Sequence, residues 1–303
     1  DDAVAILFAA RHLDLVGVST VHGNNTLVNT TRNGLAVLEL GKIDVPLAAG
    51  CEGPLTQKRV GIASLHGLTG LDGAVVPAPT RKPITTHGVD FIIEMAQRHK
   101  GELVLAVVGP QTNAAIALRK EPRLKEWLRE ITIMGGSTGG GNATPVAEFN
   151  IYCDPDAAWT VFECGVPIRM AGYNITHRTG FDERDIARLK ASGKLIAGTM
   201  AGLMQFYLEK QRATFGYNVA PMHDVCSIIP YVDPSLITFA NTSVRVELNG
   251  TLTRGMTVCD LRTPIEAPPE KMRNRQPPNA LVAIDVQSRK LIDLVLDTLL
   301  SYH

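Results

Sequence analysis

The chain has 303 residues, and its 30 Lys and Arg residues balance its 30 Asp and Glu residues, giving a formal net charge of +0. This balance argues against a nucleic-acid-binding protein, which normally carries a basic patch. Hydrophobic residues make up 45% of the chain, enough for a large core. No apolar run reaches the roughly 18 residues of a membrane-spanning helix, so we expect no membrane partner. The charge balance does not exclude binding of a small neutral or anionic ligand.

Helical apolar spacing alternates with β-branched runs along the chain. Helices are predicted over residues 2–11, 27–41, 87–100, 112–119, 154–164, 182–189, 195–212 and 289–302. Strands are predicted over residues 13–21, 45–49, 103–108, 130–134, 167–171 and 281–286. The continuous apolar run LVLAVV at 103–108 is typical of a strand buried on both faces. Strands that alternate with helices predict an α/β fold, with a parallel sheet covered by helices.

Two further features shape the predicted organisation. Two β-rich runs surround Asn249-Gly250, a dipeptide that favours tight turns, so we expect a small β-hairpin region near residues 243–258. Residues 53–86 and 264–278 are predicted to be long polar loops. The chain shows no internal repeat and no convincing linker, so a single domain over residues 1–303 is expected.

The cysteines favour a reducing environment. Cys51, Cys153, Cys164, Cys226 and Cys259 are widely spaced and form no CxxC pair. A zinc site or a disulfide framework is therefore improbable, and we expect reduced thiols in a cytoplasmic protein.

Polar residues follow several predicted strands. Residues 22–25 follow the first strand, residues 109–113 follow LVLAVV, and residues 148–150 come after the glycine-rich stretch behind another strand. In open α/β sheets, ligands bind beyond the carboxyl ends of the strands. These polar groups should therefore converge on one edge of the sheet.

Each candidate group also has a structural explanation. Asp1 and Asp2 favour the dipole of the helix that follows, or they bind a hard cation such as Ca²⁺ together with other carboxylates. Asp224 either caps a helix or supplies one of those carboxylates, with His223 beside it as a titratable acid. Glu148 and Asn150 either end a loop or hydrogen-bond a row of sugar hydroxyls. No GxGxxG follows the first strand and no GxxxxGK[ST] occurs, so a phosphate-cradling loop is not supported.

Several segments, in this order, resemble the nucleoside hydrolase family of the inosine–uridine-preferring type. They are DDAVAILFA (1–9), STVHGNNT (19–26), LHGLTGLDG (65–73), VVGPQTNAA (107–115), IMGGSTGGGNATPVAEFNIYCDP (133–155), HDVC (223–226) and GMTVCD (255–260). The similarity covers essentially the whole chain, and each motif alone would be modest support. The resemblance implies a single α/β domain with a Rossmann-like, mostly parallel sheet flanked by helices.

The resemblance also implies an activity and a set of partners. The reaction is hydrolysis of the N-glycosidic bond of a ribonucleoside to ribose and free base, with Ca²⁺ at the floor of the pocket. The family suggests nucleoside salvage and a homodimer or homotetramer.

The resemblance assigns roles only to those residues whose positions match the motifs of the family. Asp2, Asp224 and the backbone carbonyl of Val108 match metal ligands, and His223 matches the residue that protonates the leaving base. The residues matching substrate-binding positions are Asp1, Asn24, Asn142, Glu148 and Asn150 for ribose, Met134 for the pocket wall and His66 near the base. Residues 206–219 match a segment that closes over the base, where Tyr207, Gln211 and Tyr217 are candidates to contact it. His223 favours inosine or pyrimidine substrates.

One family motif has no counterpart in the sequence. Members carry DxDPG on a first strand shortly before the Asp pair, and that motif supplies another metal ligand, which also acts as the base toward water. We expect this segment to be missing before Asp1, and its loss would expose neighbouring strands. A non-catalytic ribose or nucleoside binder is therefore the alternative function. A nicotinamide-dependent oxidoreductase is a third hypothesis, which the lack of GxGxxG opposes.

Overall fold

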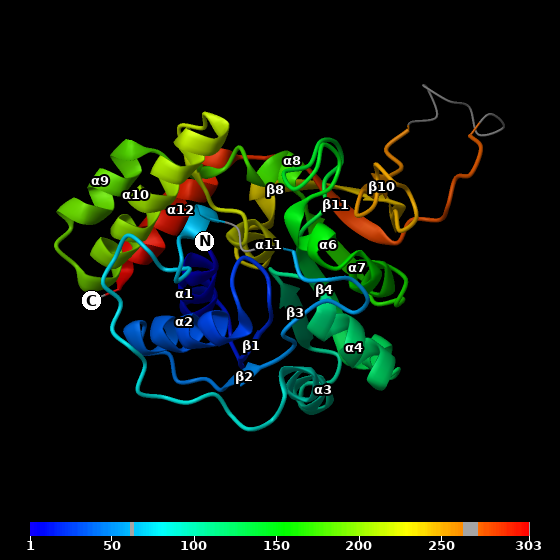
Figure 1. Ribbon diagram of the computed structural model, residues 1–303, viewed down its shortest axis with the longest axis horizontal. Coiled ribbons are helices and arrows are strands. Elements are labelled where there is room, and N and C mark those ends of the chain that lie inside the picture. Colours follow the sequence, from blue (N-terminus) through cyan, green and yellow to red (C-terminus); the bar gives the residue numbers. More distant parts are fainter. Residues whose placement is uncertain (61–63, 263–271, 303) are drawn as a thin grey trace.

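Five strands form the central sheet, as the computed structural model of residues 1–60, 64–262 and 272–302 describes it (Figure 1). Their order is β3 (Leu103–Val107), β4 (Leu128–Met134), β5 (Ile168–Ala171), β11 (Ala280–Val286) and β8 (Ile237–Thr242). Neighbouring strands run parallel except β8, which pairs antiparallel with β11. The predicted α/β class with a mostly parallel sheet is confirmed.

Helices cover both faces of this sheet because the side chains of each strand alternate between the faces. Ile131 and Ile133 of β4 join a buried cluster with α3 (Gly88–Arg98), α4 (Thr112–Lys120) and α7 (Pro155–Phe162). Thr132 points the other way, and its hydroxyl donates to the carbonyl of Ser227 in α11 (Val225–Ile228). On that side, a second cluster unites α11 with α1 (Asp2–His12), α10 (Leu195–Phe215) and α12 (Ser288–Ser301).

A separate parallel pair of strands lies beside β3. β1 (Val18–Thr20) pairs with β2 (Leu47–Ala49), and α2 (Leu27–Leu40) packs on both. Within residues 1–60, 64–262 and 272–302, no strand pairs with the second edge of β1 or of β3. Residues of both strands instead line one cavity. A gap bordered by two strand edges therefore separates the pair from the central sheet.

The prediction that residues 103–108 form a strand buried on both faces is wrong. The side chains of β3 are half-buried, and Ala106 is exposed. The physical reason is the gap, because a strand with a cavity along one edge lacks the neighbour that would cover its side chains.

The hairpin region exists, but its turn differs from the one expected. β9 (Val244–Val246) and β10 (Thr257–Cys259) pair antiparallel. The connection spans residues 247–256, so Asn249-Gly250 does not join the strands directly. The backbone N–H groups of Asn249 and Gly250 both donate to the Glu247 carboxylate, which shapes a longer loop.

The remaining elements are short, apart from the helix α9 (Glu183–Ala191). They are η1 (Ser64–His66), α5 (Leu124–Trp127), α6 (Phe149–Cys153), α8 (Tyr173–Thr176), β6 (Gly180–Phe181), α9 (Glu183–Ala191), β7 (Ala220–Pro221), η2 (Ile229–Tyr231) and η3 (Pro234–Leu236). The strand predicted over 13–21 is shorter, because only Val18–Thr20 pairs with β2. In the predicted loop 264–278, residues 264–271 lie outside the described residues.

Two observations concern membrane-spanning helices and the state of the cysteines. Among the described residues, no helix combines the length and the apolar character needed to cross a bilayer. The cysteines are all free thiols, with Cys153 and Cys226 buried.

Asn113 fastens the β1–β2 pair to α4. Its Nδ2 donates to the Ser19 hydroxyl (3.0 Å) and to the Thr20 carbonyl (2.9 Å), and its Oδ1 accepts from the backbone N–H of Cys51 (2.9 Å). The side chain is buried, and removing it takes the hydrogen-bond partner from the Cys51 backbone N–H, whereas the Thr20 carbonyl keeps the Gly50 N–H.

We predict that Asn113→Ala lowers the free energy of unfolding by about 1–3 kcal/mol, the cost of orphaned buried polar groups. Urea denaturation measures this change. Asn241→Ala, at an exposed position of β8, is the matched control and should change stability by less than about 0.5 kcal/mol. Equal effects of the two substitutions would show that the Asn113 amide does not fasten the strand pair.

Candidate active site

A cavity of about 1210 Å³ opens at the carboxyl ends of β1, β3 and β4 and continues into the gap between β1 and β3. Every residue predicted for the site lines it. They are Asp1, Asp2, Asn24, His66, Val108, Met134, Asn142, Glu148, Asn150, Tyr207, Gln211, Tyr217, His223 and Asp224. The cavity therefore draws on segments from the first residue to α11, which the strand-end rule predicts in part.

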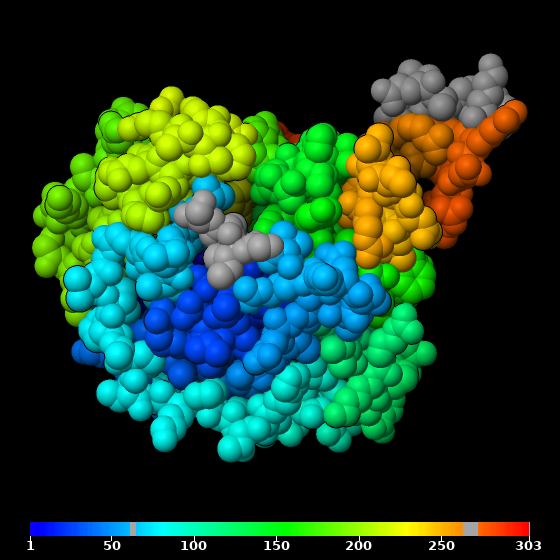
Figure 2. All heavy atoms as spheres, in the orientation of Figure 1, coloured from blue at the N-terminus to red at the C-terminus, as the bar shows by residue number. Residues whose placement is uncertain are grey.

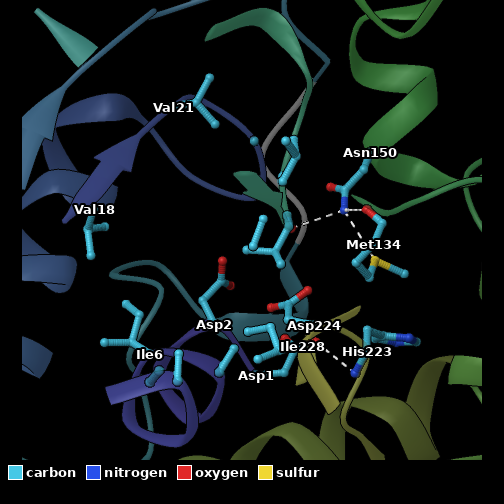
Figure 3. A pocket seen from close by; sticks show the side chains of 18 of the residues that line it. Asp1, Asp2, Ile6, Val18, Val21, Met134, Asn150, His223, Asp224 and Ile228 are labelled. Atoms are coloured by element: carbon cyan, nitrogen blue, oxygen red, sulfur yellow. Dashed lines mark hydrogen bonds between the residues drawn. The ribbon is translucent and has the colours of Figure 1, made fainter. Parts of the chain in front are cut away.

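Three carboxylates meet at the floor of the cavity. Asp1 caps α1, Asp2 lies in the first turn of that helix, and Asp224 immediately precedes α11. Their oxygens lie within 4.8 Å of one another, and Figure 3 shows Asp2 and Asp224 close together. Burial raises the pKa of Asp224 well above its usual value, and repulsion from Asp2 raises it further. The family resemblance assigns Asp1 to ribose, whereas the structure brings it into this cluster, as the alternative of a shared cation site for Asp1 and Asp2 predicts.

Among the described residues, no lysine or arginine forms an ion pair with these carboxylates, although the amino-terminal ammonium group acts to lower the pKa of Asp224. His66 Nε2 lies 3.9 Å from Asp1 Oδ1, and burial, chiefly, lowers the pKa of His66 to about 3, so its imidazole is neutral near pH 7. Clustered oxygen ligands of this kind fit a hard divalent cation.

Glu148 and Asn150 organise the ends of β3 and β4. Glu148 caps α6, and its carboxylate accepts from the backbone N–H groups of Gly136 and Asn150. Burial nevertheless raises its pKa to about 7, against the lowering effect of these hydrogen bonds. Asn150 Nδ2 donates to the carbonyls of Val108 (3.2 Å) and Met134 (3.1 Å). Both strand ends are therefore fixed to one amide, and Figure 3 shows Asn150 beside Met134.

His223 lies between the acidic cluster and α8. Its backbone N–H donates to Asp1 Oδ2 (3.2 Å), and its Nδ1 lies 2.7 Å from the Thr176 hydroxyl. Burial lowers the pKa of His223 to about 3, with further lowering from the amino-terminal ammonium group and from His177. The side chain is therefore an uncharged imidazole near pH 7.

Aromatic rings and one amide form the other wall of the cavity. His66 stacks on Tyr207 of α10, with ring centroids 4.6 Å apart. In Figure 2 the cyan segment after η1 borders the yellow-green surface of α10, and η1 and α10 are in contact. Gln211 is buried on α10, and its Oε1 has no hydrogen-bond partner among the described residues. This wall can stack on a planar ring and donate or accept hydrogen bonds at its edge.

Sequence reasoning missed Tyr173. It lines the cavity, and its hydroxyl lies 2.9 Å from that of Tyr217, so Tyr217 makes a contact across the cavity wall. Tyr173 follows β5 after Gly172, and the rule that polar residues gather behind strand ends could have found it.

The sequence contains one GxSxG pattern, which is typical of serine hydrolases, but here the pattern has a structural role. GGSTG at residues 135–139 matches GxSxG. Ser137 is buried and does not line the cavity, and its hydroxyl accepts from the backbone N–H of Gly139. It is therefore not placed as a nucleophile.

Comparison with known proteins assigns the site to a class of enzyme. Residues 1–293 match the family model described as inosine-uridine preferring nucleoside hydrolase. The pyrimidine-specific ribonucleoside hydrolase RihA of Enterobacter sp. (strain 638) is 37% identical over 306 aligned residues, which cover 100% of this chain and 95% of that protein.

Solved structures agree with this class. A plant nucleoside hydrolase, the PpNRh1 enzyme, superposes with a TM-score of 0.89 at 31% identity, over 99% of this chain and 95% of that one. A purine-preferring ribonucleoside hydrolase from Gardnerella vaginalis gives 0.90 at 27% identity, with the same coverage. The fold and site are those of enzymes that cleave N-glycosyl bonds. The chain belongs to the inosine-uridine preferring nucleoside hydrolase family, and it is a ribonucleoside hydrolase.

The raised pKa of Glu148 predicts a pH dependence of stability. In a chelator, the contribution of Glu148 to the free energy of unfolding should fall as pH rises from about 4.5 to about 7, because the folded chain keeps a proton that the unfolded chain has released. The lowered pKa values of His66 and His223 contribute a rise below about pH 6.5, so the contribution of Glu148 is measured as a difference between variants. Glu148 contributes up to about 1.4 kcal/mol per pH unit in that window. Urea denaturation at pH 5, 6 and 7 measures the slope.

Glu148→Gln cannot titrate, so between pH 5 and 7 its free energy of unfolding should change with a more positive slope than that of the unsubstituted chain. Glu126→Gln, at an exposed position of α5, is the control and should leave the slope unchanged. Parallel slopes for Glu148→Gln and the unsubstituted chain would mean that the pKa of Glu148 is not raised by folding.

Proposed function

We propose that this protein hydrolyses the N-glycosidic bond of pyrimidine ribonucleosides, and of inosine, in a Ca²⁺-dependent reaction that yields ribose and free base. The observation that carries this proposal is the meeting of Asp1, Asp2 and Asp224 at the floor of a cavity that His223 also lines. The cavity is large enough for a nucleoside, since ligand pockets commonly measure about 300–1,000 Å³.

The acidic cluster would hold the cation. Asp2 and Asp224 offer carboxylates, and Val108 offers a carbonyl whose described hydrogen bond uses one of its two lone pairs. Oxygen ligands of this kind suit Ca²⁺. When bound, the cation would lower the pKa of a water molecule and orient it toward the sugar.

Ribose would lie over this floor. Asp1 and Glu148 can accept hydrogen bonds from ribose hydroxyls, and Asn24, Asn142 and Asn150 line the same region. Anionic acceptors beside the sugar favour the positive charge of an oxocarbenium-like transition state. The pKa of Glu148 near 7 should fall when a cation binds nearby, so that its acceptor form prevails.

His223 would act on the leaving base. The base takes the electron pair of the broken glycosidic bond and becomes negatively charged. A neutral imidazole can stabilise that charge by donating an N–H hydrogen bond. An anion beside the ring favours uptake of a proton from water on the other nitrogen, and the donated proton then passes to the base. A general acid of this kind contributes about 10²–10⁴-fold.

The preference for pyrimidines rests on relatives and on one wall of the cavity. RihA, at 37% identity, is named pyrimidine-specific. Gln211 presents a buried Oε1 without a described partner, which can accept a hydrogen bond from a base edge. The stacked pair of His66 and Tyr207 can cover the face of a planar ring.

The gap between β1 and β3 supports a further element of the proposal. Backbone groups on both bordering edges lack strand partners among the described residues, and apolar residues of 13–18 and 103–107 line the gap. Buried backbone groups are almost always paired in native proteins, so an extended parallel strand is the element that fits. We propose that this strand carries the DxDPG motif implied by the resemblance, with its aspartates completing the cation site and acting as base toward water.

We further propose, from the family resemblance, a role in nucleoside salvage in the cytoplasm and an assembly of two or four copies. Segments from Asp1 to Asp224 contribute to one cavity, which favours a single domain.

The enzyme expressed from its complete gene is predicted to release ribose from uridine, and more slowly from adenosine. A chelator should abolish turnover, and Ca²⁺ should restore it and raise the melting temperature, because a ligand that binds only the folded state stabilises it. Asp224→Asn should remove both effects of Ca²⁺. A reducing-sugar assay and thermal unfolding measure these outcomes.

Absence of turnover on every ribonucleoside would overturn the proposed activity. If calorimetry then detected ribose binding, the non-catalytic binder would be the correct function. Full turnover in chelator would contradict the role of the cation alone.

His223→Ala is predicted to lower kcat for uridine by about 10²–10⁴-fold, the usual contribution of a general acid. It should lower turnover of p-nitrophenyl riboside much less, because p-nitrophenolate leaves without protonation. His87→Asn, at the exposed cap of α3, is the control and should leave both rates unchanged. Equal losses on the two substrates would remove His223 from the acid role.

A further inference from the structure

Helix α8 holds the ring of His223 from behind the cavity. Thr176, the last residue of α8, is fully buried, and its hydroxyl lies 2.7 Å from His223 Nδ1. Tyr173, the first residue of α8, lies against the ring with centroids 6.0 Å apart. Since Nδ1 is engaged with α8, Nε2 is the nitrogen left for a ligand in the cavity.

The surroundings of Thr176 determine the direction of this hydrogen bond. Among the described residues, His223 Nδ1 is the only hydrogen-bond partner of the Thr176 hydroxyl. A buried O–H that does not donate costs free energy, so the hydroxyl donates and Nδ1 accepts. A neutral imidazole that accepts at Nδ1 carries its proton on Nε2.

α8 is itself fixed in place on both sides. The backbone N–H of Tyr173 donates to the Gly136 carbonyl (2.7 Å), and Asn174 Nδ2 donates to the Ala283 carbonyl of β11 (2.9 Å). Asn174 Oδ1 accepts from the backbone N–H of Thr138. Thr176 therefore cannot follow the imidazole if the ring turns, and its hydroxyl defines one ring orientation.

We propose that Thr176 is a positioning residue for the hydrolysis, which holds His223 in the Nε2–H form facing the leaving base. This inference rests on the proposed function of His223. In the catalytic step the glycosidic bond breaks while a water oxygen bonds to C1′ of ribose and releases a proton. The electron pair of the broken bond goes to the base, and the Nε2–H group stabilises the negative charge of the base through a hydrogen bond. Loss of an orienting partner leaves the imidazole free to rotate or to place its proton on Nδ1.

A purely structural role for Thr176 predicts different behaviour. The side chain could simply fill space at the end of α8, and valine would fill the same volume without a hydroxyl. Thr176→Val therefore separates packing from hydrogen bonding, and Thr176→Ser keeps the hydroxyl. Thr179 lies three residues further on and is equally buried. Its hydroxyl lies near the Ser288 hydroxyl and the Ile175 carbonyl. Thr179→Val is the matched control.

The first measurement is ¹⁵N NMR of the His223 ring on this chain at neutral pH, with the resonance identified by its loss in His223→Ala. We expect a protonated Nε2 and an unprotonated, hydrogen-bonded Nδ1. Thr176→Val should move the Nδ1 resonance toward that of an unbonded nitrogen, whereas Thr176→Ser and Thr179→Val should not. A protonated Nδ1 in the neutral ring, or an unchanged resonance in Thr176→Val, would overturn the proposal without any assay of activity.

The second measurement compares two substrates of the enzyme expressed from its complete gene. Thr176→Val should lower kcat for uridine by about 10- to 100-fold, since a misoriented acid loses part of its contribution. It should lower kcat for p-nitrophenyl riboside by less than about 3-fold, and Thr176→Ser should restore uridine turnover. Equal losses on both substrates would assign Thr176 a structural role. Failure of the unsubstituted enzyme to cleave any ribonucleoside would instead overturn the proposed function. The NMR result does not depend on that outcome.

Discussion

Repulsion among three carboxylates is the constraint on which the rest of the site depends. Asp1 and Asp2 belong to the first helix and Asp224 to a segment more than two hundred residues later, yet their oxygens lie within 4.8 Å of one another. Packing of α1 against α11 in one buried cluster forces this approach. Asp224 is the buried member of the cluster, and an unpaired buried charge typically costs several kcal/mol of desolvation, so a divalent cation is favourable at this place.

Burial keeps the groups beside the cluster neutral. His66 and His223 both have pKa values lowered to about 3, chiefly by burial, and Glu148 has a pKa raised to about 7 by burial. Uncharged imidazoles add no counterion to the cluster, and each can donate a hydrogen bond. The floor of the cavity thus brings carboxylates together beside neutral imidazoles. A cation and an uncharged nucleoside match that division of charge.

Much of this could be predicted from the sequence, because the strand-end rule and short motifs locate polar residues without any long-range information. Asn150 and Glu148 were found in this way, and so were the helices and most of the strands. What failed depended on neighbours that are distant in sequence. The exposure of Ala106 follows from the gap beside β3, and the apolar run LVLAVV gives no sign of that gap. The Asn249-Gly250 turn failed because the Glu247 side chain stabilises a longer loop. Thr176 was missed because only tertiary packing brings a small hydroxyl to His223.

The fold leaves the choice of base to a few side chains. A purine-preferring enzyme superposes on this chain with a TM-score of 0.90, although the relative at 37% identity is named pyrimidine-specific. Scaffolds this similar cannot distinguish a purine from a pyrimidine by backbone shape. Gln211 Oε1 and the stacked His66 and Tyr207 face the cavity, and side chains placed there can discriminate between bases, because an unpaired buried acceptor penalises any base that brings no donor to it. In the proposed function the acidic floor acts on ribose, which all these substrates share, so cleavage and base selection would use neighbouring parts of one cavity, which meet where His66 Nε2 lies 3.9 Å from Asp1 Oδ1.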